Sequence, residues 1–276
     1  MTKFNLECCN MLSAEKHKFE YEYLLKRFGS IGTVGGWIRK HIDRHGFIIL
    51  QGLESEFYDL SSAKLFFTKL SSHIGTLVPH NLGQSDFVWE IKPKSSISPI
   101  ATFSEHNKAA SLHTDSQYRK LPEKYMALLV FRQAECAGGE TLLLDFNLVF
   151  NELKKSYLGR QTIEFACKTK FPIAVPTIFQ TQNKTEYIYS SLISDIPMIR
   201  YRYDTLKTGL ELIKRSHVKD SAEKLQVFND LIHRSRYCSS LLLNNGEAIF
   251  VDNHRMLHGR SPFLDSNRLL LRIRMN

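Results

Sequence analysis

The chain has 276 residues, and its 37 lysines and arginines against 28 aspartates and glutamates give a formal charge of +9. Hydrophobic residues make up 43% and charged residues 24%, which is ordinary for a globular protein and excludes a disordered tail, a collagen-like repeat and a coiled coil. No apolar run approaches the roughly 20 residues that span a bilayer, and the N-terminus has no basic region followed by an apolar core. We therefore expect a cytoplasmic protein without a membrane partner.

The cysteines and the basic residues argue against two further classes of protein, disulfide- or zinc-stabilised proteins and nucleic-acid-binding proteins. The number of cysteines is odd and no pair has Cys-x-x-Cys spacing, so neither a disulfide framework nor a zinc knuckle is indicated, and a reducing compartment fits. Lysine and arginine are spread along the chain rather than clustered, which favours a generally basic surface over nucleic-acid binding. The five cysteines are Cys8, Cys9, Cys136, Cys167 and Cys238.

Hydrophobic periodicity predicts a mixed N-terminal part followed by a β-rich part. Helix-like stretches cover residues 14–28, 34–45 and 60–74, and a short apolar strand covers 46–50. Further on, helices are predicted at 145–155 and 221–236. Strands are predicted at 87–91, 125–131, 140–144, 163–170, 187–192, 237–243, 248–251 and 269–273.

This order predicts a mainly β fold with flanking helices, built on a double sheet or jelly roll. No linker rich in proline, glycine or serine divides the chain, so residues 1–276 are expected to form a single domain. Within it, residues 1–75 form the helical and mixed part, and residues 86–276 form the jelly-roll core with insertions.

The first candidate for chemistry is His113-Thr114-Asp115. Because side chains alternate along a strand, His113 and Asp115 project to the same side, where an imidazole and a carboxylate are two ligands for a divalent metal. A histidine from the segment 251–263 could complete two histidines and one carboxylate, an arrangement that suits ferrous iron because it leaves open positions. His254 and His258 compete for that place.

The strand that begins with Arg268 carries more positive charge. Period-2 alternation places Arg268, Leu270, Arg272 and Arg274 on one face. A guanidinium beside an iron site offers a fork for a carboxylate, whereas the alternative interpretation is a solvated outer face of an edge strand.

Together these residues resemble the taurine dioxygenase-like (TauD/TfdA) group of Fe(II)- and 2-oxoglutarate-dependent oxygenases, which includes clavaminate synthase-like amino-acid hydroxylases. The resemblance runs from about Gly46 to the end of the chain and implies a double-stranded β-helix fold. Its strongest stretches are 113–115, 137–142, 252–260 and 268–272.

The resemblance implies a role for particular residues. Arg268 would hold the remote carboxylate of 2-oxoglutarate, Thr141 would hydrogen-bond this cosubstrate, and Arg272 would help to hold it or reach an anionic group of the substrate. The pattern Asn-x-Arg-x-x-His-x-Arg favours His258 over His254, which becomes a turn residue. The implied ligands of Fe(II) are therefore His113, Asp115 and His258.

The implied reaction consumes 2-oxoglutarate and O2, releases succinate and CO2, and hydroxylates an unactivated C–H bond of a small molecule. Asp115 occupies the ligand position that halogenating relatives leave vacant, so hydroxylation or desaturation is expected. Asn253 and Arg255 are expected to orient a ligand or fix the loop. Gly138 and Gly139 are expected to form a turn or bulge before the next strand.

Substrate contacts are the least defined part of the prediction. His80 and Asn81 lie where relatives often place a substrate-facing loop, and Glu105 could meet a substrate amine. The run from His258 to Phe263 favours a free or carrier-linked amino acid or a natural-product intermediate. The alternatives are a sulfonate- or betaine-type substrate, a desaturase, a nucleic-acid or protein demethylase, and a non-catalytic binding protein. A carrier protein and a second copy of the chain stay open as partners.

Overall fold

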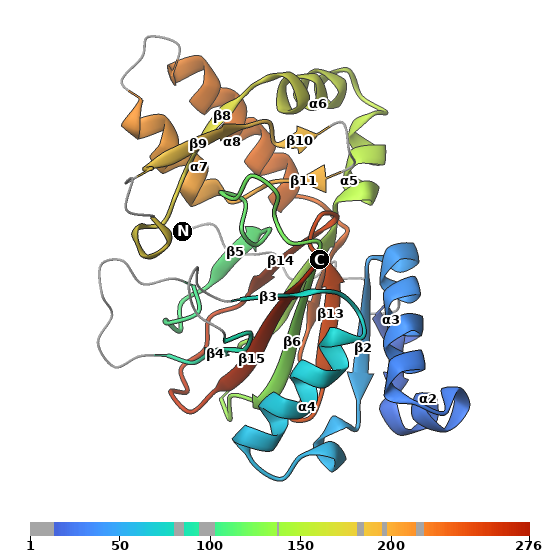
Figure 1. Cartoon of the computed structure of the whole chain (residues 1–276). Helices are drawn as coiled ribbons and strands as arrows, with labels where there is room; N and C mark the ends of the chain where they lie inside the picture. Colours follow the sequence, from blue (N-terminus) through green and yellow to red (C-terminus); the bar gives the residue numbers. More distant parts are fainter. Residues whose placement is uncertain are drawn as a thin grey trace.

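The computed structural model describes residues 14–79, 86–93, 103–136, 138–180, 185–194, 198–213 and 218–276. Two sheets pack face to face at the centre (Figure 1). The larger has the order β1-β2-β13-β6-β15-β3, with β4 also paired to β15, and the smaller has the order β12-β7-β14-β5. This is the predicted jelly roll with flanking helices.

The strand bounds follow the chain as follows. The larger sheet contains β1 (Lys18–Glu20), β2 (Phe47–Gln51), β3 (Leu77–Val78), β4 (Trp89–Ile91), β6 (Tyr125–Arg132), β13 (Ala248–Asp252) and β15 (Leu269–Met275). The smaller sheet contains β5 (Ala110–His113), β7 (Thr141–Asp145), β12 (Cys238–Leu241) and β14 (Met256–Arg260). Apart from the parallel pair of β1 and β2, neighbouring strands run antiparallel.

Helices cover the outer face of each sheet, so the molecule has three apolar layers. The larger sheet packs against α2 (Tyr21–Phe28), α3 (Ile31–His45) and α4 (Leu60–Ser72). The smaller sheet packs against α5 (Phe146–Leu153), α6 (Tyr157–Lys168), α7 (Tyr203–Leu212) and α8 (Val218–His233) (Figure 1). The third layer, which includes Met126, Leu143 and Leu270, lies between the sheets.

Short elements complete the fold around the second group of helices. Two hairpins are formed by β8 (Phe171–Ala174) with β9 (Tyr187–Ser190) and by β10 (Ile193–Ser194) with β11 (Met198–Ile199). The 3-10 turns are η2 (Glu15–His17), η3 (Leu53–Glu56) and η4 (Thr177–Phe179).

Local sequence signals set the ends of the helices that precede the site. The Ser30 hydroxyl accepts a hydrogen bond from the backbone N–H of Thr33 at the start of α3, and Asp59 and Ser62 form a capping box at the start of α4. At the end of α3, Gly46 has φ of 89°. A Cβ atom there would lie 2.7 Å from the Met256 sulfur, so glycine allows α3 to pack against the start of β14.

Strand β15 has the predicted alternation, and it lies inside the sheet. Leu271 and Ile273 belong to the core under the helices, whereas Leu270 faces the smaller sheet. Because β15 pairs with β6 on one side and with β3 and β4 on the other, the alternative of a solvated edge strand is wrong. The arginines of its inner face, Arg272 and Arg274, are therefore carried between the two sheets.

Two of the predicted elements are wrong. Residues 163–170 were expected to form a strand, but most of them belong to helix α6, where the buried positions Gly159, Thr162 and Ala166 follow helical spacing. The helix predicted over 14–28 is instead η2, strand β1 and the shorter helix α2. Pairing of β1 with the edge of β2 overrides the helical preference of its charged residues.

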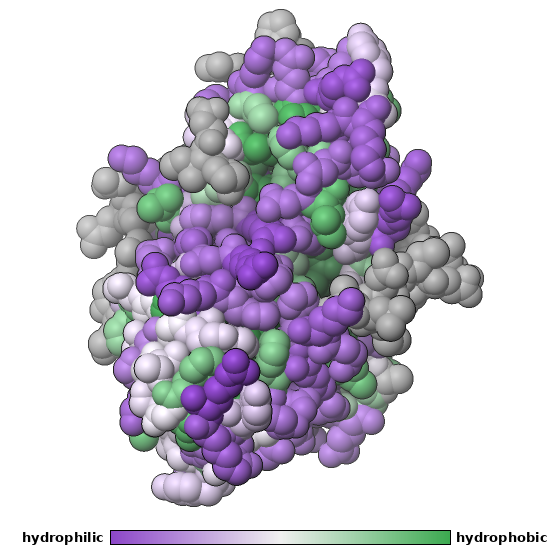
Figure 2. All heavy atoms as spheres, turned by 90° about the vertical axis from the view of Figure 1, so that its right-hand side faces the viewer, coloured by the Kyte–Doolittle hydropathy of each residue, from purple (hydrophilic) through white to green (hydrophobic). Residues whose placement is uncertain are grey.

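The outward surface is largely polar over the face seen in Figure 2, where α2, α3, α5 and α6 lie, with apolar residues gathered mainly in its upper half. Within the described residues, no helix combines the length and apolarity needed to cross a bilayer. The polar outer face is explained by amphipathic helices, which bury their apolar side against a sheet and expose their polar side.

Three histidines meet where η2 packs against α3. Nδ1 of His17 lies 3.0 Å from Nε2 of His41, and the His45 ring lies 4.5 Å from the His41 ring between centroids. Burial lowers the pKa of His41 to about 4, assisted by the neighbouring His45, His17 and Arg44. The folded protein therefore keeps this histidine neutral well below its ordinary pKa.

We expect this cluster to make the fold sensitive to mild acid. Between about pH 6.5 and pH 4 the unfolded chain takes up a proton at His41 that the folded chain does not, so stability falls as the pH falls through this window. Urea unfolding at pH 7.5 and 5.0 should show a smaller loss of midpoint for His41→Phe, which keeps a ring but cannot titrate. Equal losses in both proteins would contradict the assignment.

Candidate active site

Two histidines face each other on neighbouring strands of the smaller sheet. His113 is the last residue of β5, and His258 lies in β14 directly opposite it in the antiparallel register. Their ring centroids are 4.4 Å apart. The strands approach closely beside them because residue 259 is glycine: a Cβ atom there would lie 2.7 Å from the Ala110 carbonyl oxygen.

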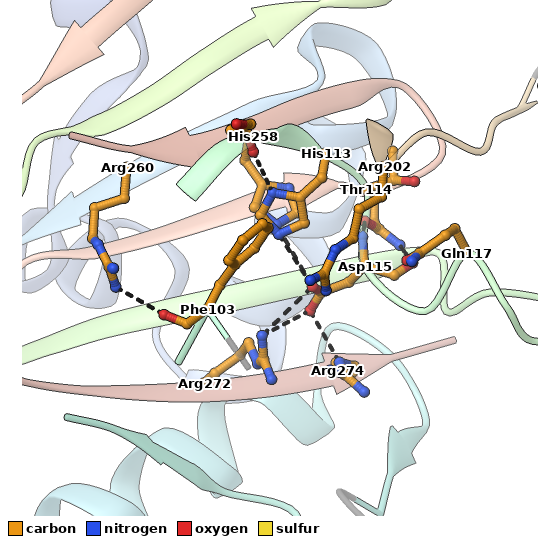
Figure 3. Close-up of polar contacts among 12 residues, drawn as sticks. Phe103, His113, Thr114, Asp115, Gln117, Arg202, His258, Arg260, Arg272 and Arg274 are labelled. Carbon is orange, nitrogen blue, oxygen red and sulfur yellow. Dashed lines mark hydrogen bonds and ion pairs between the residues drawn. The ribbon is translucent and has the colours of Figure 1, made fainter. Parts of the chain in front are cut away.

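Asp115 follows β5 by two residues and joins the histidines. Its Oδ1 atom lies 3.8 Å from Nε2 of His113 and 3.8 Å from Nε2 of His258. One ligand atom from each residue lies within 4.8 Å of the others, and all three side chains are buried. Figure 3 shows both rings pointing toward the carboxylate. This is the set of three side chains that the sequence predicted would meet.

The position of the ring proton leaves Nε2 of His113 available as a ligand atom. Its Nδ1 atom lies 2.8 Å from the Ser111 carbonyl oxygen, an acceptor, so Nδ1 carries the proton and Nε2 presents a lone pair. Burial, with the neighbouring His258, lowers the pKa of His113 to about 3. The ring is therefore neutral at pH 7.

Asn253 fixes the backbone of Asp115. Its side-chain Oδ1 accepts the Asp115 N–H at 2.7 Å, and its Nδ2 donates to the Asp115 carbonyl at 3.2 Å and to the Glu123 carbonyl at 2.8 Å. Asn253 is buried, so these bonds form without competition from water. They connect the turn before β14 to the segment after β5.

Two arginines of β15 approach Asp115 from the opposite side (Figure 3). Nε of Arg274 lies 3.0 Å and Nη1 of Arg272 lies 3.2 Å from Oδ2 of Asp115. Burial opposes ionisation of this carboxyl group, but the two guanidinium groups outweigh it and hold the pKa well below its usual range. Asp115 is therefore a carboxylate whose Oδ1 faces the histidines.

The donor set fits a divalent transition metal. An imidazole nitrogen of each histidine lies 3.8 Å from one carboxylate oxygen, a separation that two bonds of about 2.0–2.2 Å to a shared ion can span. Two histidines and one carboxylate on one side of an ion leave its other side open, which is the arrangement of non-haem iron oxygenases.

A cavity opens beside the three residues and contains the predicted cosubstrate residues. Thr141, the first residue of β7, is buried in its wall. Arg268 directly precedes β15, and burial lowers its pKa to about 10, so it is a cation at pH 7. The lining residues are Ile91, Phe103, Ser104, Ala110, His113, Met126, Leu128, Thr141, His258, Gly259, Arg260, Arg268, Leu270 and Arg272.

The predicted glycine turn positions Arg268. Gly138 and Gly139 have φ of 118° and 79°, a backbone conformation that favours glycine. Nη2 of Arg268 donates to the Gly139 carbonyl at 3.1 Å, and its guanidinium carbon lies 4.8 Å from the centre of the Phe263 ring. These contacts hold the head group beside the glycine turn in the cavity wall.

Arg260 holds the segment that precedes the metal motif. It is buried, and its Nη2 donates to the carbonyls of His106 and Lys108 at 2.7 Å each, while Nη1 donates to the Phe103 carbonyl at 3.2 Å (Figure 3 shows the last contact). This fixes the segment that carries Glu105, a half-buried residue that is absent from the cavity lining. His80 and Asn81, the other predicted substrate contacts, lie outside the described residues.

The remaining predictions for the C-terminal motif agree with the structure. His254 lies in the turn between β13 and β14, and its Nε2 is 2.9 Å from the Pro122 carbonyl oxygen. Arg255 forms an ion pair with Asp145 and donates to the Arg44 carbonyl, so it fixes the loop. His254 is not part of the group of three ligands.

Sequence reasoning missed a polar group on the other side of His113. Arg202 forms an isolated bridge with His113 through the backbone, and its guanidinium carbon lies 4.0 Å from the centre of the Phe103 ring. Its Nε and Nη2 atoms each donate to Asp204 at 2.8 Å. The only signal for this group was the charged and aromatic run 200–204, which has no metal-ligand spacing.

Residues 28–274 match the family described as Taurine catabolism dioxygenase TauD, TfdA family. Because this match covers most of the chain, the protein belongs to the TauD/TfdA family, whose members are Fe(II)- and 2-oxoglutarate-dependent oxygenases. No curated protein sequence matches the chain.

Three solved structures have the same fold at low sequence identity. Non-haem iron oxygenase OrfP, in complex with Fe and α-ketoglutaric acid, has a TM-score of 0.66 and 16% identity over 92% of this chain and 84% of that chain. Asparagine oxygenase, in complex with Fe(II), 2S,3S-3-hydroxyasparagine and succinate, has 0.64 and 16% over 92% and 84%. PvcB from Pseudomonas aeruginosa, an oxygenase from an isonitrile synthetic pathway, has 0.60 and 15% over 88% and 80%.

Proposed function

We propose that the chain acts as a single catalytic domain that hydroxylates a C–H bond of an amino acid or an amino-acid-derived natural-product intermediate. His113, Asp115 and His258 would hold Fe(II). The observation that carries the proposal is the convergence of one donor atom from each of these three buried side chains. A ferrous ion bound there supplies the chemistry that activates O2, with 2-oxoglutarate as the second cosubstrate.

Residues that line the cavity would bind the cosubstrate and confine the substrate. Arg268, a buried cation in the cavity wall, would pair with the remote carboxylate of 2-oxoglutarate, and Thr141 would donate to the same cosubstrate. The apolar walls, including Met126 and Leu128, would exclude water and confine the substrate so that one C–H bond faces the metal.

Arg272 favours a substrate with an anionic group. Its guanidinium lines the cavity, and burial lowers its pKa to about 10, so it is charged at neutral pH. A free amino acid offers such a group in its carboxylate, whereas a carrier-linked amino acid does not. We therefore place the free amino acid first, with the carrier-linked form as the second candidate.

Two of the structural neighbours support an amino acid as substrate. OrfP is described in complex with (3S)-hydroxy-L-arginine, and asparagine oxygenase with a hydroxyasparagine. Oxidation of a sulfonate or betaine, and desaturation, would use the same proposed iron ligands and cosubstrate residues, and they stay as alternatives. Demethylation of nucleic acid or protein has less support, since the described basic side chains of the site are buried. Pure ligand binding has less support because the three donor residues and Arg268 are all present. A cytoplasmic location and homo-oligomer formation are proposals from the sequence alone.

The proposal is tested with a panel of free amino acids, amino-acid amides, which lack the carboxylate, and the two comparison compounds taurine and a betaine. The protein, loaded with Fe(II), is incubated with 2-oxoglutarate and O2, and mass spectrometry measures succinate and a gain of one oxygen in the panel member. We expect one free amino acid to stimulate succinate formation, and its amide to fail. Stimulation by no member, or by taurine or a betaine alone, would overturn the amino-acid proposal.

A further inference from the structure

Arg274 makes a contact that the cosubstrate and substrate roles leave unexplained. Its Nε donates to Oδ2 of Asp115 at 3.0 Å, and the residue is only 7% exposed. Oδ2 is the oxygen that faces away from the histidines, because Oδ1 is the atom 3.8 Å from both Nε2 atoms. The Arg274 guanidinium therefore binds Asp115 on the side of the carboxylate opposite the histidines, as seen in Figure 3.

Arg272 and Arg274 share Asp115 but differ in what else they can reach. Arg272 lines the cavity, and its guanidinium carbon lies 4.9 Å from the centre of the Trp89 ring. Arg274 is absent from the cavity lining. An incoming anion could therefore draw Arg272 away from Asp115, but it could not reach Arg274 in the same way.

The position of Arg274 follows from the strand that carries it. Residues 272 and 274 project to the same side of β15, and β15 faces the smaller sheet across the central layer. The larger sheet thus delivers two cations to a carboxylate that the smaller sheet places between its histidines. A carboxylate held through one oxygen has its other oxygen presented in a fixed direction.

We propose that Arg274 is a positioning residue for the metal centre: its guanidinium holds Oδ2 of Asp115, so that Oδ1 alone is presented to the iron, and it keeps Asp115 paired when Arg272 engages an anionic ligand. This inference rests on the proposed iron site. Because metal-ligating carboxylates are oriented by their outer hydrogen bonds, loss of such a partner typically lowers metal affinity about 10–100-fold.

The test uses Co(II) alone, titrated into the full-length metal-free protein without cosubstrate. Visible absorption reports both the dissociation constant and the coordination of the ion. For Arg274→Met we expect Co(II) binding at least about 10-fold weaker than in the native protein, with an altered spectrum, because Arg272 alone then holds Oδ2 and the direction of the carboxylate is less fixed. Arg274→Lys keeps the charge without the fork and should give an intermediate affinity.

Lys18→Met is the matched control, because it also removes a largely buried ion pair of the larger sheet, with Glu247, without touching Asp115 or the loop that carries Asn253. It should bind Co(II) with the native affinity and spectrum. Native affinity and spectrum in Arg274→Met, or tighter binding, would overturn the inference. If that variant does not fold, native affinity in Arg274→Lys would overturn it instead.

The proposed function fails separately from this inference. If the native protein binds no equivalent of Co(II), or if His258→Ala binds it equally well, the iron site itself is wrong. If the native protein binds one equivalent that depends on His258, only the variants of Arg274 decide the positioning role.

Discussion

Replacing His258 with alanine is expected to abolish binding of one equivalent of Fe(II) and to reduce substrate-coupled turnover of 2-oxoglutarate by at least about 100-fold. The reason is that the ring would provide one of the three protein donors proposed among the described residues, and loss of a donor exceeds the 10–100-fold effects of groups that merely orient one. Turnover is measured as succinate formed, and metal binding by titration of the metal-free protein.

His254→Ala is the matched control, four residues earlier in the same motif. Its ring contacts the Pro122 carbonyl and no donor of the site, so metal binding should persist and turnover should stay within a few-fold of native. The opposite pattern, with loss in His254→Ala and activity in His258→Ala, would exchange the roles of the two histidines.

Alanine at Asp115 is a less selective test of the same site. It removes a ligand, but it also leaves Arg272 and Arg274 buried without their carboxylate. Breaking a buried ion pair in this way costs about 3–5 kcal/mol, so loss of activity could reflect loss of the fold. Among the residues that the structure describes, His258 has no such pairing with a charged group outside the proposed metal site.

Replacing Arg268 with alanine is expected to raise the KM for 2-oxoglutarate about 10–150-fold while leaving kcat at saturating cosubstrate close to native. The guanidinium would contribute a charge-assisted pair in a buried cavity, and such hydrogen bonds are worth about 1.5–3 kcal/mol. Initial rates of succinate formation across a range of 2-oxoglutarate concentrations provide the measurement.

Two variants sharpen this prediction. Arg268→Lys keeps the charge but not the fork and should have an intermediate KM. Arg272→Met should raise the KM for the amino-acid substrate and leave that for 2-oxoglutarate unchanged if Arg272 serves the substrate. An unchanged cosubstrate requirement in Arg268→Ala would mean that another cation holds the keto acid.

The sequence was sufficient to predict the parts of the site that depend on short spacing. The two-residue spacing keeps His113 and Asp115 together, although β5 ends at His113 and Asp115 lies in the turn that follows, so the predicted strand does not reach Asp115. Alternation does place Arg272 and Arg274 on one face of β15. The family motifs added His258, which lies 143 residues after Asp115 in the chain. Alternation alone could not reveal that β15 lies inside a sheet rather than at its edge.

The missed features depend on packing between distant segments. Residues 163–170 contain Ile163 and Phe165, which favour strands, but the pairing of α6 with α5 and α8 decides their conformation. The contact of Arg202 with Phe103 joins segments about 100 residues apart and leaves no trace in either. The position of Glu105, which was predicted to meet the substrate, likewise depends on a distant contact, because Arg260 binds the carbonyl of the next residue, His106.

The division of the site between distant stretches of chain has a consequence for biosynthesis. As the polypeptide leaves the ribosome, His113 and Asp115 emerge first, while His258 and the arginines of β15 are added only after more than a hundred further residues. A nascent chain therefore carries two donors without the third and an aspartate without its cations. With the proposed ligands, completion of the metal site would follow the translation of β14 and β15, and a product truncated before them would be inert.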